Sequence, residues 1–306
     1  MITFRKYINP PEGFWFSTIR KCNRLFPDKL YLRLMFRSKM GYWPNLKNPK
    51  KFSEKLQWLK LYNRRPEYTT MVDKYVVKNY VAKIIGEQYI IPTIGVWDKP
   101  EDIEWDKLPN QFVLKTTHGG GSNGVAICRD KAAFDKNKAV QKLNENLGND
   151  VYRRYREWPY KNVPKRIIAE KYLEESDGSG ELCDYKFSCF DGEVTDVMVC
   201  IDRQIGEPKF YFFDKQWNLL RLNIRGKNAP KDFTLPKPAC MDEMFELASK
   251  LSKGLPYARV DLYAVNNHPY FGEITFFPQS GFDTKLLPET EILHGSKIVL
   301  PRETTR

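Results

Sequence analysis

Two carboxylates and an arginine in the C-terminal third have the spacing of a site for metal-assisted phosphate chemistry. The β-rich segments that flank the Asn-Asn pair at 266–267 predict a hairpin. Alternation along the first strand puts Arg259 and Asp261 on one face, and Glu273 and Thr275 lie on the corresponding face of the second strand. Facing carboxylates repel one another unless a cation lies between them, so the pattern favours a Mg²⁺ site. Solvated charges on a surface hairpin are the alternative.

A lysine followed by a glycine-rich loop forms a second constellation. The β-rich run 112–115 ends in Lys115, and another β-rich run covers 125–128. Backbone N–H groups of glycines bind anions well, so the pattern favours a strand–loop–strand flap over phosphates. An ordinary glycine-rich hairpin is the alternative, and neither a Walker A loop nor a Rossmann turn is present. The loop consists of Thr116, Thr117, His118, Gly119, Gly120, Gly121, Ser122, Asn123 and Gly124.

A third segment, Glu170 to Leu173, ends a β-branched run where main-chain donors and acceptors are placed to contact an adenine edge. The aromatic and basic mixture at 152–160 has the residue types that stack on nucleic-acid bases. No signature of a known RNA-binding module accompanies it, so nucleic acid is not an expected partner.

The elements that position these residues follow from the spacing of apolar side chains. Helical spacing predicts a helix from Asp73 to Ile85, capped by Gly86 and followed by an extended segment over 89–93. The first forty residues predict one or two short amphipathic helices, and Ser53 opens the next helix. Further helices are expected over 139–148 and 241–253, and strands over 184–190, 194–201 and 208–214.

Composition indicates a folded protein with an anionic partner. Of 306 residues, 42% are hydrophobic, which supplies a sizeable core, and the net charge is +12. Residues 1–40 contain nine Lys or Arg against two acids, so they hold +7 of this excess. The six cysteines and three histidines have no metal-ligand spacing, and reduced structural thiols are expected.

The chain has neither a membrane-spanning apolar run nor the apolar region of a secretory signal, so a cytoplasmic location is expected. The N-terminal cations are available for peripheral docking on anionic lipid or a lipid-linked glycan at the inner face of the membrane. A solvated helix face is the alternative.

The ordered motifs resemble the ATP-grasp superfamily. They are Asp73-Lys74, Lys115 with its glycine loop, Glu170-Lys171-Tyr172-Leu173, Arg259-Val260-Asp261 and Gly272-Glu273-Ile274-Thr275. More specifically, the chain is similar to the TupA-like ATP-grasp family, which is associated with teichuronopeptide and other cell-surface polysaccharide synthesis. This narrower resemblance covers about 35–285 and lies in Asn48 to Leu59, Val72-Asp73-Lys74-Tyr75 and Asp184-Tyr185-Lys186-Phe187.

The resemblance implies an α/β (α+β) ATP-grasp fold that binds the nucleotide between two α+β subdomains. A basic, aromatic-rich helical region is expected over 1–70, and a helix–strand lead-in that contributes to the nucleotide site over 71–110. The first subdomain, with the glycine loop and hinge, is expected over 111–173. The second, with the Mg²⁺ and phosphate site, is expected over 174–306.

The resemblance also implies the site residues. Lys115 and Arg259 are the expected catalytic residues, and Arg259 would steady the transferred phosphoryl group. Asp261 and Glu273 would hold Mg²⁺, with Thr275 where many ATP-grasp enzymes have Asn, which makes one metal ion more secure than two. Ser280 and Gly281 are expected to line the acceptor site. The implied nucleotide contacts are Lys74, Lys115, His118, Gly119, Gly120, Gly121, Ser122, the hinge residues Glu170, Lys171 and Leu173, Asp184 as a ribose contact, and Lys186.

The implied activity is an ADP-forming carboxylate–amine ligase that uses ATP and Mg²⁺. Its substrates would be an acidic sugar or glycan carboxylate and an amine, in synthesis or amino-acid modification of a capsular or teichuronopeptide-like polysaccharide. A phosphotransferase on a sugar, a glycan or a partner's histidine is the closest alternative. A non-catalytic polysaccharide- or RNA-binding module is disfavoured because the charged motif residues are intact, and a glycosyltransferase because no convincing Asp-x-Asp motif is present.

Overall fold

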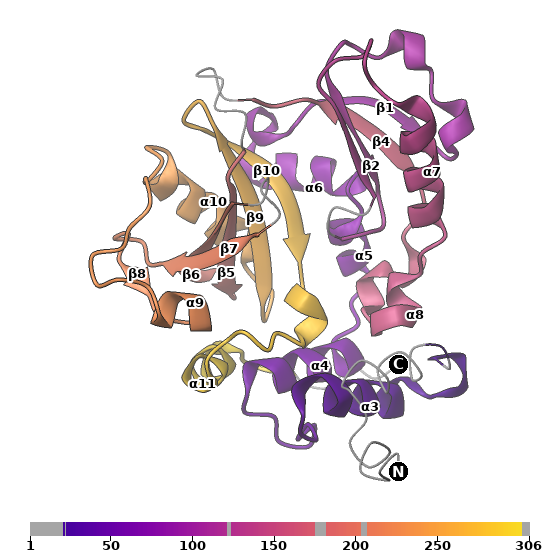
Figure 1. Ribbon diagram of the computed structural model, residues 1–306. Coiled ribbons are helices and arrows are strands. Elements are labelled where there is room, and N and C mark those ends of the chain that lie inside the picture. Colours follow the sequence, from indigo (N-terminus) through magenta and orange to yellow (C-terminus); the bar gives the residue numbers. More distant parts are fainter. Residues whose placement is uncertain (1–20, 22, 121–123, 175–181, 203–206, 302–306) are drawn as a thin grey trace, which may run out of the picture.

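The computed structural model describes residues 21, 23–120, 124–174, 182–202 and 207–301. Two antiparallel sheets stand side by side over a layer of helices (Figure 1). The smaller sheet has the order β1-β4-β2-β3 and the larger β10-β9-β5-β6-β7-β8. The strands are β1 (Thr93–Trp97), β2 (Phe112–Thr116), β3 (Val125–Cys128), β4 (Ile167–Lys171), β5 (Asp184–Phe190), β6 (Glu193–Ile201), β7 (Lys209–Phe213), β8 (Leu219–Leu220), β9 (Ala258–Val265) and β10 (His268–Thr275).

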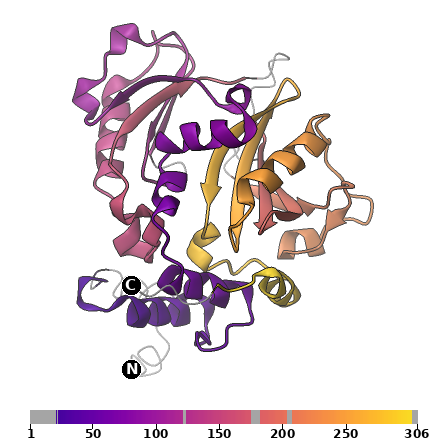
Figure 2. The same cartoon turned by 180° about the vertical axis from the view of Figure 1, so that it is seen from behind.

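Helices cover the sheets and form the layer beneath them. In both Figure 1 and Figure 2, α3 lies at the edge of the molecule and α4 lies between it and the sheets. The α-helices are α3 (Asp28–Met40), α4 (Phe52–Tyr62), α5 (Glu67–Val72), α6 (Val76–Ile85), α7 (Lys136–Leu147), α8 (Val151–Tyr155), α9 (Ile224–Lys227), α10 (Met241–Ser252) and α11 (Pro288–Lys297). The 3-10 helices are η1 (Asn23–Leu25), η2 (Glu87–Tyr89), η3 (Pro100–Asp102), η4 (Trp105–Lys107), η5 (Trp158–Asn162) and η6 (Pro278–Gly281).

Each sheet has a hydrophobic core of its own. Phe187 of β5 and Val260 of β9 are buried against Phe245 of α10 in the larger core. In the smaller core, Phe112 and Leu143 join β2 to α7. The mixed architecture confirms the expected α/β (α+β) class. The expected lead-in, 71–110, supplies β1, which pairs with β4 of the smaller sheet.

The predicted hairpin is confirmed by its turn. Asn266 and Asn267 both have positive φ, 51° and 58°, as the tight turns that match the twist of paired strands require. The strands expected over 184–190, 194–201 and 208–214 are β5, β6 and β7, with ends displaced by one residue at most.

Two local predictions need correction. The helix expected from Asp73 to Ile85 begins at Val76, because the Asp73 carboxylate accepts hydrogen bonds from the backbone N–H groups of Tyr75 and Val76 and ends the preceding helix instead. The extended segment expected over 89–93 is only partly extended. It starts in η2, and β1 begins at Thr93.

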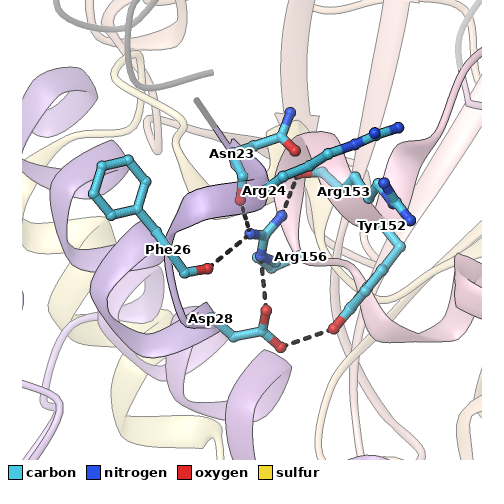
Figure 3. A pocket seen from close by; sticks show the side chains of 7 residues that line it. All are labelled: Asn23, Arg24, Phe26, Asp28, Tyr152, Arg153 and Arg156. Carbon is cyan, nitrogen blue, oxygen red and sulfur yellow. Dashed lines mark hydrogen bonds and ion pairs between the residues drawn. The ribbon is translucent and has the colours of Figure 1, made fainter. Parts of the chain in front are cut away.

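An ion cluster around Asp28 fastens α3 to the rest of the molecule (Figure 3). Asp28 accepts from Arg64 Nη2 at 2.6 Å and from the Tyr152 hydroxyl at 2.8 Å, and Arg156 Nε lies 2.7 Å away. Burial opposes ionisation of Asp28, but the hydrogen bonds from Arg64 and Tyr152 and the nearby arginine charges hold its pKa below the usual value. The carboxylate in its charged form therefore joins α3 to α8 and to the segment that follows α4.

We predict that Asp28→Asn lowers the free energy of unfolding by about 2 kcal/mol at neutral pH, because buried Arg156 loses its counter-charge. A depressed folded-state pKa means that the contribution is present above about pH 4 and is lost as the pH falls through the folded pKa. Urea denaturation of both proteins over a pH series measures this. A difference that stays constant as the pH falls would contradict the charged role of Asp28.

Candidate functional site

The four predicted side chains of the β9–β10 hairpin come together on one face. Glu273 pairs in register with Asp261, and Thr275 with Arg259. Arg259 donates from Nε and Nη2 to the two Asp261 oxygens at 2.7 Å each, and its Nη2 also lies 3.4 Å from Glu273 and 3.3 Å from Thr275. The cation that separates the two carboxylates in this structure is therefore the Arg259 guanidinium.

The neighbouring strand β5 adds a buried lysine to the hairpin. Lys186 lies opposite Asp261 in the sheet, and its Nζ donates to Asp261 at 2.6 Å and to Asp184 at 2.5 Å. Burial opposes the charge on Lys186, but Asp261 and Asp184 raise its pKa. Asp184, the expected ribose contact, is thus paired with a lysine of its own strand.

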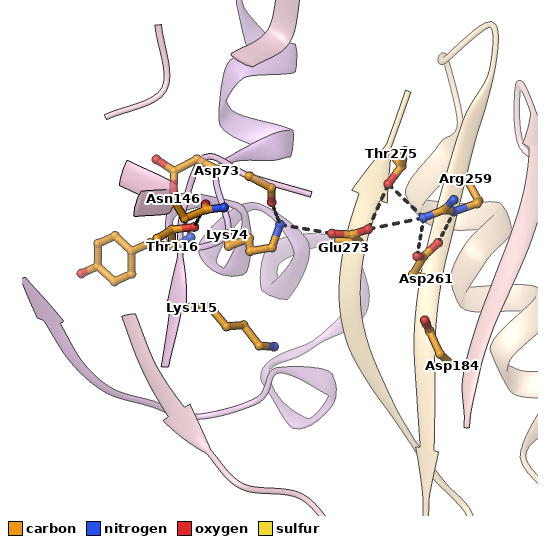
Figure 4. A network of polar contacts seen from close by, with 12 residues as sticks. Asp73, Lys74, Lys115, Thr116, Asn146, Asp184, Arg259, Asp261, Glu273 and Thr275 are labelled. Atoms are coloured by element: carbon orange, nitrogen blue, oxygen red, sulfur yellow. Dashed lines mark hydrogen bonds and ion pairs between the residues drawn. The ribbon is translucent and has the colours of Figure 1, made fainter. Parts of the chain in front are cut away.

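Lys74 links the hairpin to the smaller sheet across the space between them (Figure 4). Its Nζ lies 3.1 Å from Glu273 and also donates to the carbonyl oxygen of Gly119. Burial opposes the charge of Glu273, but Lys74, Arg259 and other nearby cations lower its pKa to about 2. Glu273 is therefore ionised at neutral pH and joins the two halves of the site.

Glu170 of β4 is enclosed by two lysines. Lys115 Nζ lies 2.6 Å from one carboxylate oxygen and Lys78 Nζ 2.5 Å from the other. Burial opposes ionisation of Glu170, yet Lys115 and Lys78 lower its pKa. The side chain of Glu170, an expected hinge residue, is therefore occupied by two lysines of the protein. Lys78 was not among the residues predicted for the site. Its position on the apolar side of the predicted helix was the feature of the sequence that could have identified it.

The glycine loop connects β2 and β3, which pair as expected for a strand–loop–strand flap. Gly124 is required by close packing, since a Cβ there would lie 2.4 Å from Thr116 Oγ1 and 2.6 Å from Asn146 Oδ1. His118 is buried, with Nε2 at 3.2 Å from the Asn146 carbonyl oxygen, and burial lowers its pKa. Its ring therefore packs on α7. The expected ligands Gly121 and Ser122 lie outside the described residues.

The turn after β10 contains the expected acceptor residues Ser280 and Gly281. Gln279, Ser280 and Gly281 have φ of 49°, 54° and 68°, a left-handed run that costs free energy for residues other than glycine. Two side chains of α4 hold the turn. Gln57 donates to the Gly281 carbonyl oxygen at 2.9 Å, and Lys60 Nζ to that of Ser280 at 2.7 Å.

Two buried charged residues, Lys60 and Glu157, support this turn. Lys60 also donates to the Tyr155 carbonyl oxygen at 3.0 Å, and the Ser280 hydroxyl donates to Glu157 at 2.6 Å. Burial lowers the pKa of Lys60 to about 7, although Glu157 acts in the opposite direction, and burial raises the pKa of Glu157. The hydroxyl and the carbonyl oxygen of Ser280 are therefore both engaged by the protein.

The charges of the site fit a divalent cation with a polyphosphate. Among the described residues, no three or more His, Cys, Asp or Glu side chains gather as a metal site, and the hairpin offers an ion the carboxylate pair Asp261 and Glu273, with the Thr275 hydroxyl nearby. Mg²⁺ in proteins is commonly held by one or two carboxylates and completed by phosphate oxygens and water. The paired groups comprise five cations, Lys74, Lys78, Lys115, Lys186 and Arg259, and four carboxylates, Glu170, Asp184, Asp261 and Glu273.

A separate hollow of about 410 Å³ lies away from these residues, between α3 and α8 (Figure 3). At its base, Arg156 is engaged by Asp28 and by the carbonyl oxygens of Asn23, Phe26 and Arg153. The hollow holds no facing carboxylate pair or lysine cluster. The chemistry therefore places the candidate site at the hairpin.

One comparison with known proteins identifies a family. Residues 54–299 match the family model described as TupA-like ATPgrasp. A comparison with curated proteins gives no significant match.

Similar solved structures include two D-alanine–D-alanine ligases. The enzyme from Bacillus anthracis complexed with ATP is 20% identical with a TM-score of 0.44, over 75% of this chain and 63% of that one. The Helicobacter pylori enzyme is 14% identical with a TM-score of 0.45, over 82% and 70%. The ATP-grasp ligase PsnB, complexed with minimal precursor, Mg and ADP, is 12% identical with a TM-score of 0.37, over 86% and 66%.

We predict that Lys60→Met and Glu157→Gln each lower the free energy of unfolding by about 2–4 kcal/mol, because each leaves a buried polar or charged partner unmatched. The double variant should lose at least about 1 kcal/mol less than the sum of the single changes. Urea denaturation of the four proteins measures this coupling. Additive losses would show that Lys60 and Glu157 support the turn independently.

Proposed function

The chain belongs to the TupA-like ATP-grasp family, and from that premise we propose that it is an ADP-forming carboxylate–amine ligase. The observation that carries the proposal is the contact of Lys74 with Glu273 of the Asp261–Glu273 pair, together with Lys115, which is bound to Glu170 on the side of the smaller sheet and points toward the hairpin. Cations on one side would bind the phosphates of a nucleoside triphosphate, and the paired carboxylates on the other side would bind the Mg²⁺ that accompanies it.

In the proposed reaction, a substrate carboxylate oxygen attacks the γ-phosphorus of ATP, and the bond from that phosphorus to the bridging oxygen breaks. The products of this step are an acylphosphate and ADP. An amine then attacks the acyl carbon, phosphate leaves, and the nitrogen loses a proton to give an amide. The protein needs no covalent nucleophile, so its contribution is to position the reactants and stabilise charge.

Different residues of the site would bind the phosphates, hold the metal ion and stabilise the transferred group. Lys74 and Lys115 would exchange their carboxylate partners for phosphate oxygens, and Asp261 and Glu273 would hold Mg²⁺, with Thr275 as an adjacent neutral oxygen. The metal ion would supply charge neutralisation between the phosphates. Arg259 already lies against both carboxylates, from where its guanidinium would stabilise the transferred phosphoryl group.

The paired groups of the site carry a net charge of +1, and Mg·ATP contributes about −2. Charge thus nearly balances when the nucleotide binds. The overall charge of +12 favours an acidic co-substrate. We propose a uronic acid or a glycan carboxylate as the acceptor. The reaction would take place in the cytoplasm and serve the synthesis or amino-acid modification of a capsular or teichuronopeptide-like polysaccharide of the cell surface.

We predict that the protein with Mg·ATP, uronic-acid acceptors and amino acids releases ADP and free phosphate only when an acceptor is present. Lys115→Ala and Asp261→Asn should each reduce this turnover by at least about 100-fold, because the first removes a cation that would bind the phosphates and the second removes a carboxylate that would hold Mg²⁺. Phosphorus NMR follows all products. Lys136→Ala, which changes an exposed lysine on α7, is the matched control and should leave turnover unchanged.

The other outcomes separate the competing functions. ADP with a stable new phosphomonoester would establish a phosphotransferase. AMP with pyrophosphate would exclude attack at the γ-phosphorus. A protein that neither binds nor turns over ATP would be a binding module rather than an enzyme.

A further inference from the structure

The outer face of α3 concentrates cations with exposed apolar side chains. Tyr31, Leu32, Met35 and Phe36 are buried, which turns the opposite side of the helix to solvent. That side repeats Lys29, Arg33 and Arg37 at intervals of four residues, so the three lie along one stripe. We call this stripe, with the exposed Leu30 and Trp43, the basic face.

Little acidic charge opposes the basic face. From Lys21 to Ser53 the sequence has nine Lys or Arg and one acid, Asp28. Asp28 is already engaged by Arg64, Tyr152 and Arg156. The local positive potential is therefore not cancelled by neighbouring carboxylates of this segment.

Two apolar side chains accompany the cations without being covered. Leu30 is 45% exposed and Trp43 is 53% exposed. The Arg33 guanidinium lies over the Trp43 ring at 5.6 Å, which places the indole beside the cationic stripe. Trp43 lies three residues beyond the end of α3, so the helix and the segment after it together expose cations, a leucine and a tryptophan. These residue types are found where proteins contact a membrane interface, with tryptophan at the level of the lipid headgroups.

The basic face lies close to the acceptor end of the site. On the buried side of α3, the Phe36 ring packs against Phe282 at 6.2 Å, one residue beyond the turn at 278–281. The thickness of one helix, about 10 Å, therefore separates the basic face from that turn. A surface bound to α3 would lie beside the turn at which the second substrate is expected.

We propose that the basic face binds the surface of a bilayer rich in anionic phospholipid and so holds the turn at 278–281, the acceptor end of the proposed site, next to the membrane. The cations supply attraction to the headgroups, and Leu30 and Trp43 enter the boundary between headgroups and acyl chains. The face is separate from the nucleotide contacts, so its binding to membranes does not depend on the ligase reaction.

The test uses the full chain without nucleotide, sedimented with phosphatidylcholine vesicles that contain about 30 mol% phosphatidylglycerol or none, in about 0.1 M salt. We expect binding only to the anionic vesicles. The triple variant Lys29→Gln, Arg33→Gln and Arg37→Gln should bind these vesicles at least about tenfold more weakly. The matched control is the triple variant Lys136→Gln, Lys138→Gln and Lys231→Gln, which removes three exposed lysines away from α3. It should lose much less affinity for the anionic vesicles.

A second readout reports on the apolar contact. Anionic vesicles should shift the tryptophan emission of the wild-type protein to shorter wavelength, and Trp43→Phe should remove most of that shift while retaining binding through the cations. Circular dichroism and thermal melting confirm that every variant is folded.

Three outcomes would overturn the proposal. The first is no binding to anionic vesicles, and the second is an equal loss in the basic-face and control triple variants, which would reflect net charge alone. The third is binding of a soluble polyuronate that requires Lys29, Arg33 and Arg37 without any vesicle binding, which would assign the face to a glycan instead.

Discussion

Alternating charges cross the space between the two sheets, and the candidate site depends on their pairing. The series runs from Lys74 through Glu273 and Arg259 to Asp261 and Lys186. Removing one member would leave a buried neighbour without its counter-charge, at a cost of several kcal/mol. The side chains are therefore held in place before any ligand arrives, which is the preorganisation that electrostatic catalysis requires.

The same pairing determines how a ligand would enter. Lys74 and Lys115 are neutralised by carboxylates of the protein, so phosphate oxygens must replace those carboxylates as partners. Glu273 and Asp261 would in turn exchange a cationic side chain for a metal ion. Such an exchange keeps each charge paired throughout, and it would couple nucleotide binding to the contact that Lys74 makes between the smaller sheet and the hairpin.

The helical layer and the acceptor turn form one supporting structure. Left-handed backbone at Gln279 and Ser280 persists only when surrounding contacts fix it. Gln57 and Lys60 of α4 supply those contacts from a segment more than 200 positions earlier in the chain. The layer thus contributes to the shape of the site without touching the predicted phosphate contacts.

The sequence predicted the parts of the site that depend on local periodicity. Alternation along each strand was enough to group Arg259 with Asp261, and Glu273 with Thr275. Their common face also depends on a bulge at Gly272, because the register set by the Asn-Asn turn alone would pair Asp261 with Gly272. The glycine loop was likewise predicted between two paired strands.

Long-range partners were not predictable in this way. No local pattern shows that Lys78 shares the Glu170 carboxylate with Lys115, or that Arg259 rather than a metal ion separates the two hairpin carboxylates in this structure. These pairings depend on which helix lies against which strand. The same holds for Lys60. Its surroundings are apolar, as at an ordinary core position, and only the folded structure shows that it binds the turn at 278–281.

The most direct test of the site is a crystal structure of the protein with Mn²⁺ and a non-hydrolysable ATP analogue, with the metal located by its anomalous scattering. The account predicts a Mn²⁺ peak in contact with Asp261 and Glu273, and triphosphate oxygens next to Lys74 and Lys115. Nucleotide or metal bound elsewhere, such as in the hollow beside Asp28 and Arg156, with the hairpin ion pairs unchanged, would contradict it.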